Sequence, residues 1–105
     1  MTNAANRDAL KAKDIADRYQ TSKDADDFKW LLNDERGRRI VWRLIGRCRV
    51  FEPVFNTHGG VMNFNEGRRD TGLFLLGEID RHCPDLFAVM AAENARKRED
   101  ERTND

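Results

Sequence analysis

The chain has 105 residues, 39% of them hydrophobic and 36% charged, and its 19 basic residues balance its 19 acidic ones. This length and polarity allow one domain with one modest core. No apolar run reaches the roughly 18 residues of a membrane span, and the N-terminus lacks the apolar stretch of a signal peptide. We therefore expect a protein with no membrane partner that stays in the cell where it is made.

The first part of the chain, residues 1–20, carries a weak helical pattern. We expect a peripheral helix here, or a segment that becomes ordered only against a partner. Thr21 and Ser22, followed by three aspartates, predict the start of a separate helix. A hydroxyl can cap free amides, and acids in the first turn complement the helix dipole. The helical domain is therefore predicted to begin at residue 21.

The next apolar residues lie on two different sides of a helix. Phe28, Leu31 and Leu32 point away from the stripe formed by Val41, Leu44 and Cys48, which only Trp30 and Gly37 join. One straight helix would have to be buried on both sides. We therefore predict a break near Asn33–Gly37, where Asn, Asp and Gly all suit one.

A central loop is predicted over residues 50–64, which contain a proline, two adjacent glycines and no helical period. A short hairpin could form around His58-Gly59-Gly60. Asn63 and Glu66 resemble a capping box and predict a helix over residues 64–82.

A last helix is predicted over residues 85–95, because Pro84 suits a helix start. Residues 96–105 contain no apolar side chain and are expected to be a solvated helix end or a disordered tail. The predicted fold is an all-α domain of three or four helices over residues 21–95. It has a central irregular loop and polar termini, namely residues 1–20 and 96–105.

Arginines dominate the middle of the chain, where residues 28–49 hold seven basic and two acidic side chains. A stripe of guanidinium groups could track phosphates, meet an acidic protein surface, or simply form a solvated face. Six arginines and no lysine between positions 36 and 49 favour bidentate pairing at a specific interface. The partner-binding candidates are the helical stripe Arg36, Arg39, Arg43 and Arg47, together with Phe74, which should be exposed.

Arg68 and Arg69 fall on the apolar side of their predicted helix, where arginines need partners. We expect structural ion pairs between them and Asp34, Glu35 or Glu66. The two histidines and two cysteines match no zinc-ligand spacing, and neither histidine has an evident paired nucleophile. We therefore expect no catalytic site, no metal site and no cofactor. Cys48 and Cys83 are expected to be reduced thiols.

Several motifs resemble those of a known family. They are Asp27-Phe28, Glu35-Arg36-Gly37-Arg38-Arg39, the aromatics Phe51 and Phe55, and the run Glu66-Gly67-Arg68-Arg69 leading into Leu73-Phe74-Leu75-Leu76. Over residues 25–92 the chain resembles a small tailed-bacteriophage family named after a Bordetella podovirus protein. The resemblance implies a phage origin and expression among virion or late genes. It implies no activity shared by the family.

The expected function is that of a non-enzymatic virion-associated or assembly protein, located in the virion or the infected-host cytoplasm. It would bind a larger phage structural component, such as a portal, tail or internal protein, in multiple copies. The alternative is a phage protein that contacts DNA through the arginine-rich helix during packaging, ejection or host regulation. Inhibition of a host enzyme is a third reading, with no positive sequence signal.

Overall fold

The computed structural model describes residues 3–103 and contains four helices. They are α1 (Ala4–Leu32), α2 (Glu35–Arg47), α3 (Gly59–His82) and α4 (Leu86–Thr103). The described residues form no strand, so the all-α prediction is confirmed. The short hairpin considered around His58-Gly59-Gly60 is wrong, because this segment begins α3.

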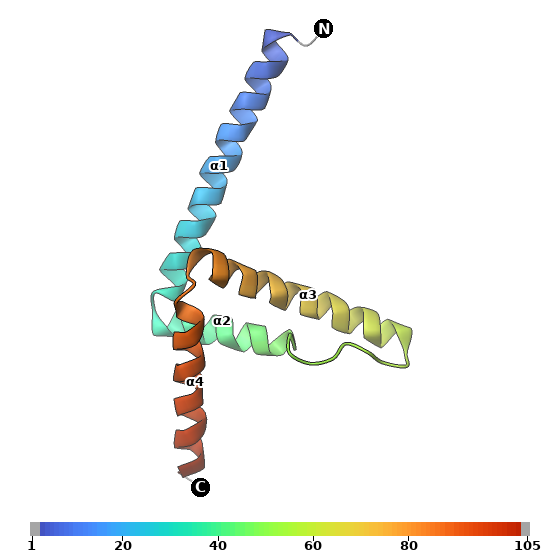
Figure 1. Ribbon diagram of the computed structural model, residues 1–105, viewed down its shortest axis with the longest axis vertical. Helices are drawn as coiled ribbons and strands as arrows, with labels where there is room; N and C mark the ends of the chain where they lie inside the picture. Colours follow the sequence, from blue (N-terminus) through green and yellow to red (C-terminus); the bar gives the residue numbers. More distant parts are fainter. Residues whose placement is uncertain (1–2, 104–105) are drawn as a thin grey trace.

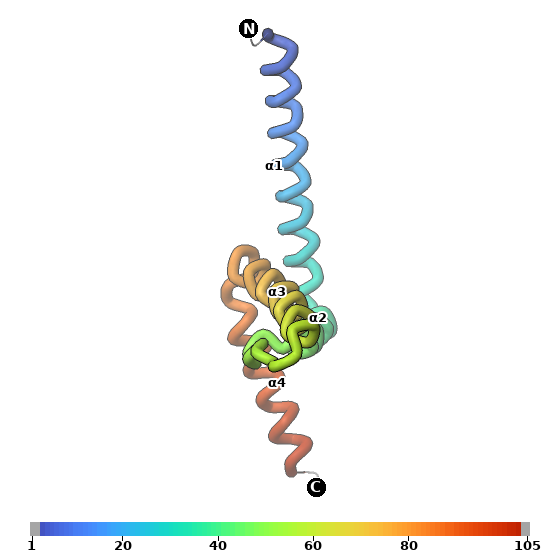
Figure 2. The backbone as a smooth tube through the Cα atoms, turned by 90° about the vertical axis from the view of Figure 1, so that its right-hand side faces the viewer, coloured from blue at the N-terminus to red at the C-terminus, as the bar shows by residue number. Residues whose placement is uncertain are grey.

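The four described helices form an elongated molecule rather than a compact globular one. α2 and α3 lie side by side in opposite directions, while α1 and α4 leave this pair towards opposite ends (Figures 1 and 2). The molecule measures 73 × 40 × 16 Å, with a radius of gyration of 19.7 Å. A compact domain of this length has a radius of gyration of about 13 Å. Much of the chain therefore lies far from the core.

The core lies where the four helices meet, at the C-terminal end of α1. All four helices and the α2–α3 loop contribute apolar side chains to it, and Leu32 and Met90 are fully buried. Its buried members are Leu32, Val41, Ile45, Val50, Ile79, Cys83 and Met90. This cluster holds the four helices together at their junction. Because it is small, the N-terminal part of α1 and the C-terminal part of α4 lie outside it.

Helix α1 is longer than the sequence predicted. It runs without interruption through Thr21 and Ser22, so the helix start predicted there is wrong. The Thr21 hydroxyl donates to the carbonyl oxygen of Asp17 at 2.9 Å, a bond that forms inside a helix, and caps nothing. The true cap is Asn3, whose side chain accepts from the Asn6 amide at 3.0 Å. The predicted boundary after residue 20 consequently falls within one helix.

The predicted break between the two central apolar stripes is present. α1 ends at Leu32, and Asp34 caps α2 by accepting from the Arg36 amide at 2.7 Å. Gly37 fits closely at this corner, because a Cβ there would collide with the backbone of Leu31. The lack of a side chain allows the two helices to meet at this angle.

The loop after α2 is shorter than predicted, because α3 already begins at Gly59. His58 is the cap, and its Nδ1 atom accepts from the Val61 amide at 3.3 Å. Asn63, the predicted cap, lies inside the helix. α4 extends from Leu86 to Thr103, well beyond residue 95, since the charged residues of the tail are good helix formers.

Candidate functional site

Helix α2 has one buried and one exposed side. Gly37, Val41 and Ile45 recur every four residues and face the other helices. The opposite side exposes two aliphatic side chains, Ile40 at 45% and Leu44 at 47%. It also exposes all four arginines of the predicted stripe, Arg36, Arg39, Arg43 and Arg47. We call these six residues the arginine face.

A shallow groove of about 550 Å³ runs between this face and α4. Cationic groups from both helices meet in it, with Lys97 of α4 opposite the arginines, and Ile40 and Trp42 add apolar surface. A neighbouring groove brings acidic side chains close by, among them Glu35, Asp100 and Glu101. The face is therefore basic at its centre and acidic at one edge.

Most of these arginines are available to a partner. The Nε atom of Arg36 lies 3.5 Å from an Asp34 carboxylate oxygen, and both side chains are largely exposed. Its backbone amide bond to Asp34 is the main reason that the pKa of this carboxyl is lowered. Within residues 3–103, Arg39, Arg43 and Arg47 form no ion pair. Exposed arginines without a carboxylate are suited to bidentate contacts with another molecule.

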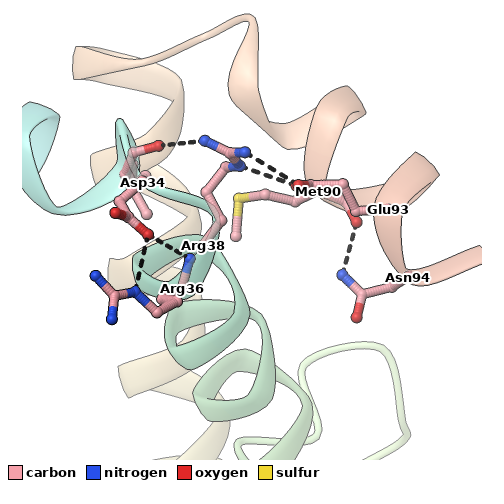
Figure 3. A network of polar contacts seen from close by, with 7 residues as sticks. Asp34, Arg36, Arg38, Met90, Glu93 and Asn94 are labelled. Carbon is pink, nitrogen blue, oxygen red and sulfur yellow. Dashed lines mark hydrogen bonds and ion pairs between the residues drawn. The ribbon is translucent and has the colours of Figure 1, made fainter. Parts of the chain in front are cut away.

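A fifth arginine of α2, Arg38, instead binds other residues of the same chain (Figure 3). Its guanidinium donates to both carboxylate oxygens of Glu93, at 2.9 and 3.0 Å, and to the carbonyl oxygen of Leu32 at 3.1 Å. The side chains of the pair are only 16% and 15% exposed. The bonds from Arg38 lower the pKa of Glu93, and the bonds to Glu93 raise the pKa of Arg38. This contact joins α1, α2 and α4.

The Arg38–Glu93 ion pair is not among those predicted from the sequence. A signal was present, because Arg38 shares a side of the helix with Val41 and Ile45, and a charge there needs a partner. Trp42 lies on the same side and packs its ring against Phe87, with centroids 5.7 Å apart. Since the Trp42 ring is half-buried against α4, it is poorly placed to stack on a base.

Arg68 and Arg69, in the middle of α3, lie beside the loop that follows α2. Arg68 donates to the side chain of Asn65 at 2.8 Å and lies over the Phe64 ring, 4.9 Å from its centre. Asn65 in turn donates to the carbonyl oxygen of Val54 at 3.4 Å. Arg69 donates to the carbonyl oxygen of Val50 at 3.3 Å. Arg69 thus joins the loop to α3 directly, while Arg68 holds the Asn65 side chain that donates to the loop.

The ion pairs expected for Arg68 and Arg69 do not form within the described part of the chain. Asp34 pairs with Arg36, while Glu35 and Glu66 are exposed and occur in none of the ion pairs between residues 3 and 103. The physical reason is that neutral oxygens lie within reach instead, namely the Asn65 side-chain amide for Arg68 and the Val50 backbone carbonyl for Arg69.

Phe74 is 64% exposed, as its helical position predicted, but it lies on α3 rather than on the arginine face. Cys83 is buried, and this burial raises the pKa of its thiol. His82 lies 3.1 Å from Glu78 one turn earlier in α3. Between residues 3 and 103, no three His, Cys, Asp or Glu side chains are grouped so as to hold a metal ion. None of the four helices, as far as they are described, is long and apolar enough to cross a membrane.

Comparison with known proteins identifies a family for the central part of this chain. The family described as Bbp19-like phage protein matches residues 28–92, which run from the last turns of α1 to the first turns of α4. No curated protein and no solved structure matches the chain. The matched region contains the arginine face, Arg68 and Arg69 with their contacts, and all seven buried members of the core. The chain therefore belongs to the family of Bbp19-like phage proteins.

Proposed function

We propose that this phage protein is a non-enzymatic assembly protein, which binds a larger structural component of the phage through the arginine face of α2. The supporting observation is the row of exposed arginines beside Ile40 and Leu44, with Arg39, Arg43 and Arg47 in no ion pair within the described residues. Apolar side chains flanked by arginines are typical of a protein interface. The expected partner surface is acidic, with an apolar centre.

The shape of the protein also supports an assembly role. Its accessible surface is 8550 Å². A compact monomer of this mass, 12.2 kDa, exposes about 6,100 Å². A protein that works within an assembly can cover such additional surface by its contacts. We expect it in the virion, or in the infected cell while particles are assembled.

DNA is the alternative partner of the same face. Exposed arginines attract phosphates, but the carboxylates of Glu35, Asp100 and Glu101 line the neighbouring groove and would repel them. The packing of Trp42 on Phe87 also removes the ring best suited to base stacking. Both observations favour a protein partner over DNA.

Mass spectrometry of purified phage particles tests the proposal. The wild-type protein is expected at a fixed stoichiometry, and the double variant Arg39→Glu/Arg43→Glu should be reduced at least about tenfold, as for loss of central interface arginines. The matched control is Arg98→Glu/Arg102→Glu, which makes the same charge change on the exposed tail of α4. The control should be incorporated like the wild type.

The proposal is overturned if the wild-type protein is absent from particles, or if the arginine-face variant is incorporated normally. DNA binding is measured in parallel by fluorescence anisotropy at about 50 mM salt, where phosphate contacts are strong. Binding that is lost only in the Arg39→Glu/Arg43→Glu variant would assign the face to DNA instead.

A further inference from the structure

Most of helix α1 lacks a partner within the chain. Every residue from Asn3 to Asp24 is exposed, and the N-terminal part of α1 stands clear of the other helices in both views (Figures 1 and 2). Its large side chains include Tyr19 at 65% and Trp30 at 78% exposure. Helices in proteins gain most of their stability from packing one side against another surface. A second surface packed against α1 would stabilise it.

One side of α1 carries alanines and two aromatic residues at the positions of a heptad repeat, together with Lys23 and Asp26. Its positions alternate at spacings of four and three residues, which is the spacing of helices that pair along one side. Phe28, which contacts His82 of α3 with ring centres 6.4 Å apart, lies on the opposite side of α1. The pattern therefore faces away from α3. We call it the α1 stripe: Ala5, Ala9, Ala12, Ala16, Tyr19, Lys23, Asp26 and Trp30.

We propose that α1 pairs in antiparallel orientation with α1 of a second copy of this chain. In this pairing each larger side chain of the stripe faces an alanine, which leaves room for it. A twofold axis exchanges the helices, so every layer occurs twice. The layers are Ala5 with Trp30, Ala9 with Asp26, Ala12 with Lys23, and Ala16 with Tyr19.

The two polar members of the stripe fit this arrangement. The ammonium group of Lys23 already lies over the Tyr19 ring, 5.4 Å from its centre, so that its stem covers apolar surface. In the antiparallel pair, Lys23 approaches Asp8 of the second copy at the edge of the interface. Asp26 likewise approaches Lys13 of the second copy. Each charge meets an opposite one.

A parallel pair would be unfavourable for the same residues. Identical positions would then face each other across the interface, Lys23 against Lys23 and Asp26 against Asp26. Such like charges repel each other in a helix pair. Trp30 would also meet Trp30, while each alanine would meet only an alanine. The charges and side-chain sizes therefore both specify the antiparallel orientation.

The remainder of the molecule leaves room for the second copy. The four-helix junction lies at the C-terminal end of α1, so an antiparallel pair places the two junctions at opposite ends (Figure 1). The first turn of the second copy arrives beside Trp30, next to a hollow of about 370 Å³ between α1 and α2. Asp34 lines this hollow, and its carboxylate complements the positive end of an arriving helix.

The available surface matches what a stable dimer needs. The chain exposes 8550 Å², about 2,500 Å² more than a compact monomer of its mass. Specific interfaces bury at least about 1,000 Å² in total. Two 29-residue helices, each about 44 Å long, can supply that area along their stripes.

Sedimentation equilibrium of the purified full-length protein tests the pairing. The wild type is expected at twice the mass of one chain, 12.2 kDa. Ala16→Arg places a charge opposite Tyr19 and should raise the dimer dissociation constant at least about tenfold. Thr21→Arg is the matched control on the opposite side of α1 and should leave the dimer unchanged. A wild type that stays monomeric, an unaffected Ala16→Arg dimer or a monomeric control would each overturn the proposal.

Disulfide formation tests the orientation. Two single-cysteine proteins, Ala9→Cys and Asp26→Cys, are mixed in a background where Cys48 and Cys83 are replaced by alanine. The antiparallel pair brings only position 9 of one copy close to position 26 of the other, so mixed disulfides are expected. Disulfides joining identical positions would show a parallel pair and overturn the proposal. Because these measurements use the protein alone, they are independent of whether the arginine face binds a phage component.

Discussion

Arg38 of α2 and Glu93 of α4 are joined by two parallel hydrogen bonds, 2.9 and 3.0 Å long, although 55 positions separate them in the sequence. The same guanidinium also reaches the carbonyl oxygen of Leu32 at the end of α1. In a molecule with few buried residues, this half-buried pair fixes how α4 leaves the junction. Glu93 lies one residue beyond the region matched by the phage family.

Loss of the Glu93 charge should destabilise the protein. Glu93→Gln leaves Arg38 half-buried without a counter-charge, which should cost about 1–3 kcal/mol of unfolding free energy. Each kcal/mol lowers the Tm of a domain this size by about 4–8 °C. Glu99→Gln, at an exposed position of the same helix, is the control and should unfold like the wild type. Equal Tm values for both variants would show that the pair contributes nothing.

The Arg38–Glu93 pair should also make the free energy of unfolding depend on pH. The pKa of Glu93 is lowered in the folded protein. The stabilisation that its carboxylate provides is therefore complete above pH 4.5, the ordinary pKa of this group. It is lost as the pH falls through the lowered pKa, where the folded carboxylate takes up a proton. Thermal unfolding from about pH 7 to about pH 3 should therefore show the wild type and Glu93→Gln converging only in acid. A difference in Tm between the two proteins that stays constant over this pH range would contradict the lowered pKa of Glu93.

Two glycines of α3 should respond in opposite directions to the same substitution. A Cβ at Gly72 would lie 2.7 Å from the Cβ of Cys48, and it would also collide with Val50. Gly72→Ala should therefore cost about 1–3 kcal/mol in denaturant unfolding. Gly77 has nothing within 4 Å of such a Cβ. Gly77→Ala should gain up to about 1 kcal/mol, because alanine favours the helix. Equal changes in unfolding free energy for the two variants would mean that α3 does not pack closely against Cys48 and Val50.

The loop after α2 should loosen when Arg69 is shortened. Arg69→Met removes the donor to the Val50 carbonyl while it keeps most of the apolar stem. The loss of about 1 kcal/mol should speed hydrogen exchange of the loop amides over residues 48–58 roughly fivefold. Arg98→Met, on the α4 tail, is the control and should leave the exchange of these amides unchanged. An unchanged loop in Arg69→Met would remove the role assigned to this contact.

Local patterns explain why some features could be predicted. The break before Glu35 followed from the two apolar stripes on either side of it, and the exposure of Arg36, Arg39, Arg43 and Arg47 followed from their spacing. Capping signals were less reliable. Thr21 and Asn63 both resemble caps but lie inside helices, because a residue that can cap a helix can also be accommodated within one, as the Thr21 bond to the Asp17 carbonyl shows.

The sequence by itself determined that this protein is helical and that α2 presents arginines outward, since both properties depend on residues within a few turns of each other. Only the tertiary structure decided that Arg38 pairs with Glu93, and that Arg68 and Arg69 bind the Asn65 side chain and the Val50 carbonyl rather than carboxylates. It also decided that most of α1 stands free of the core. These outcomes depend on how the helices cross, which brings together groups far apart in the chain and leaves other surfaces without a partner.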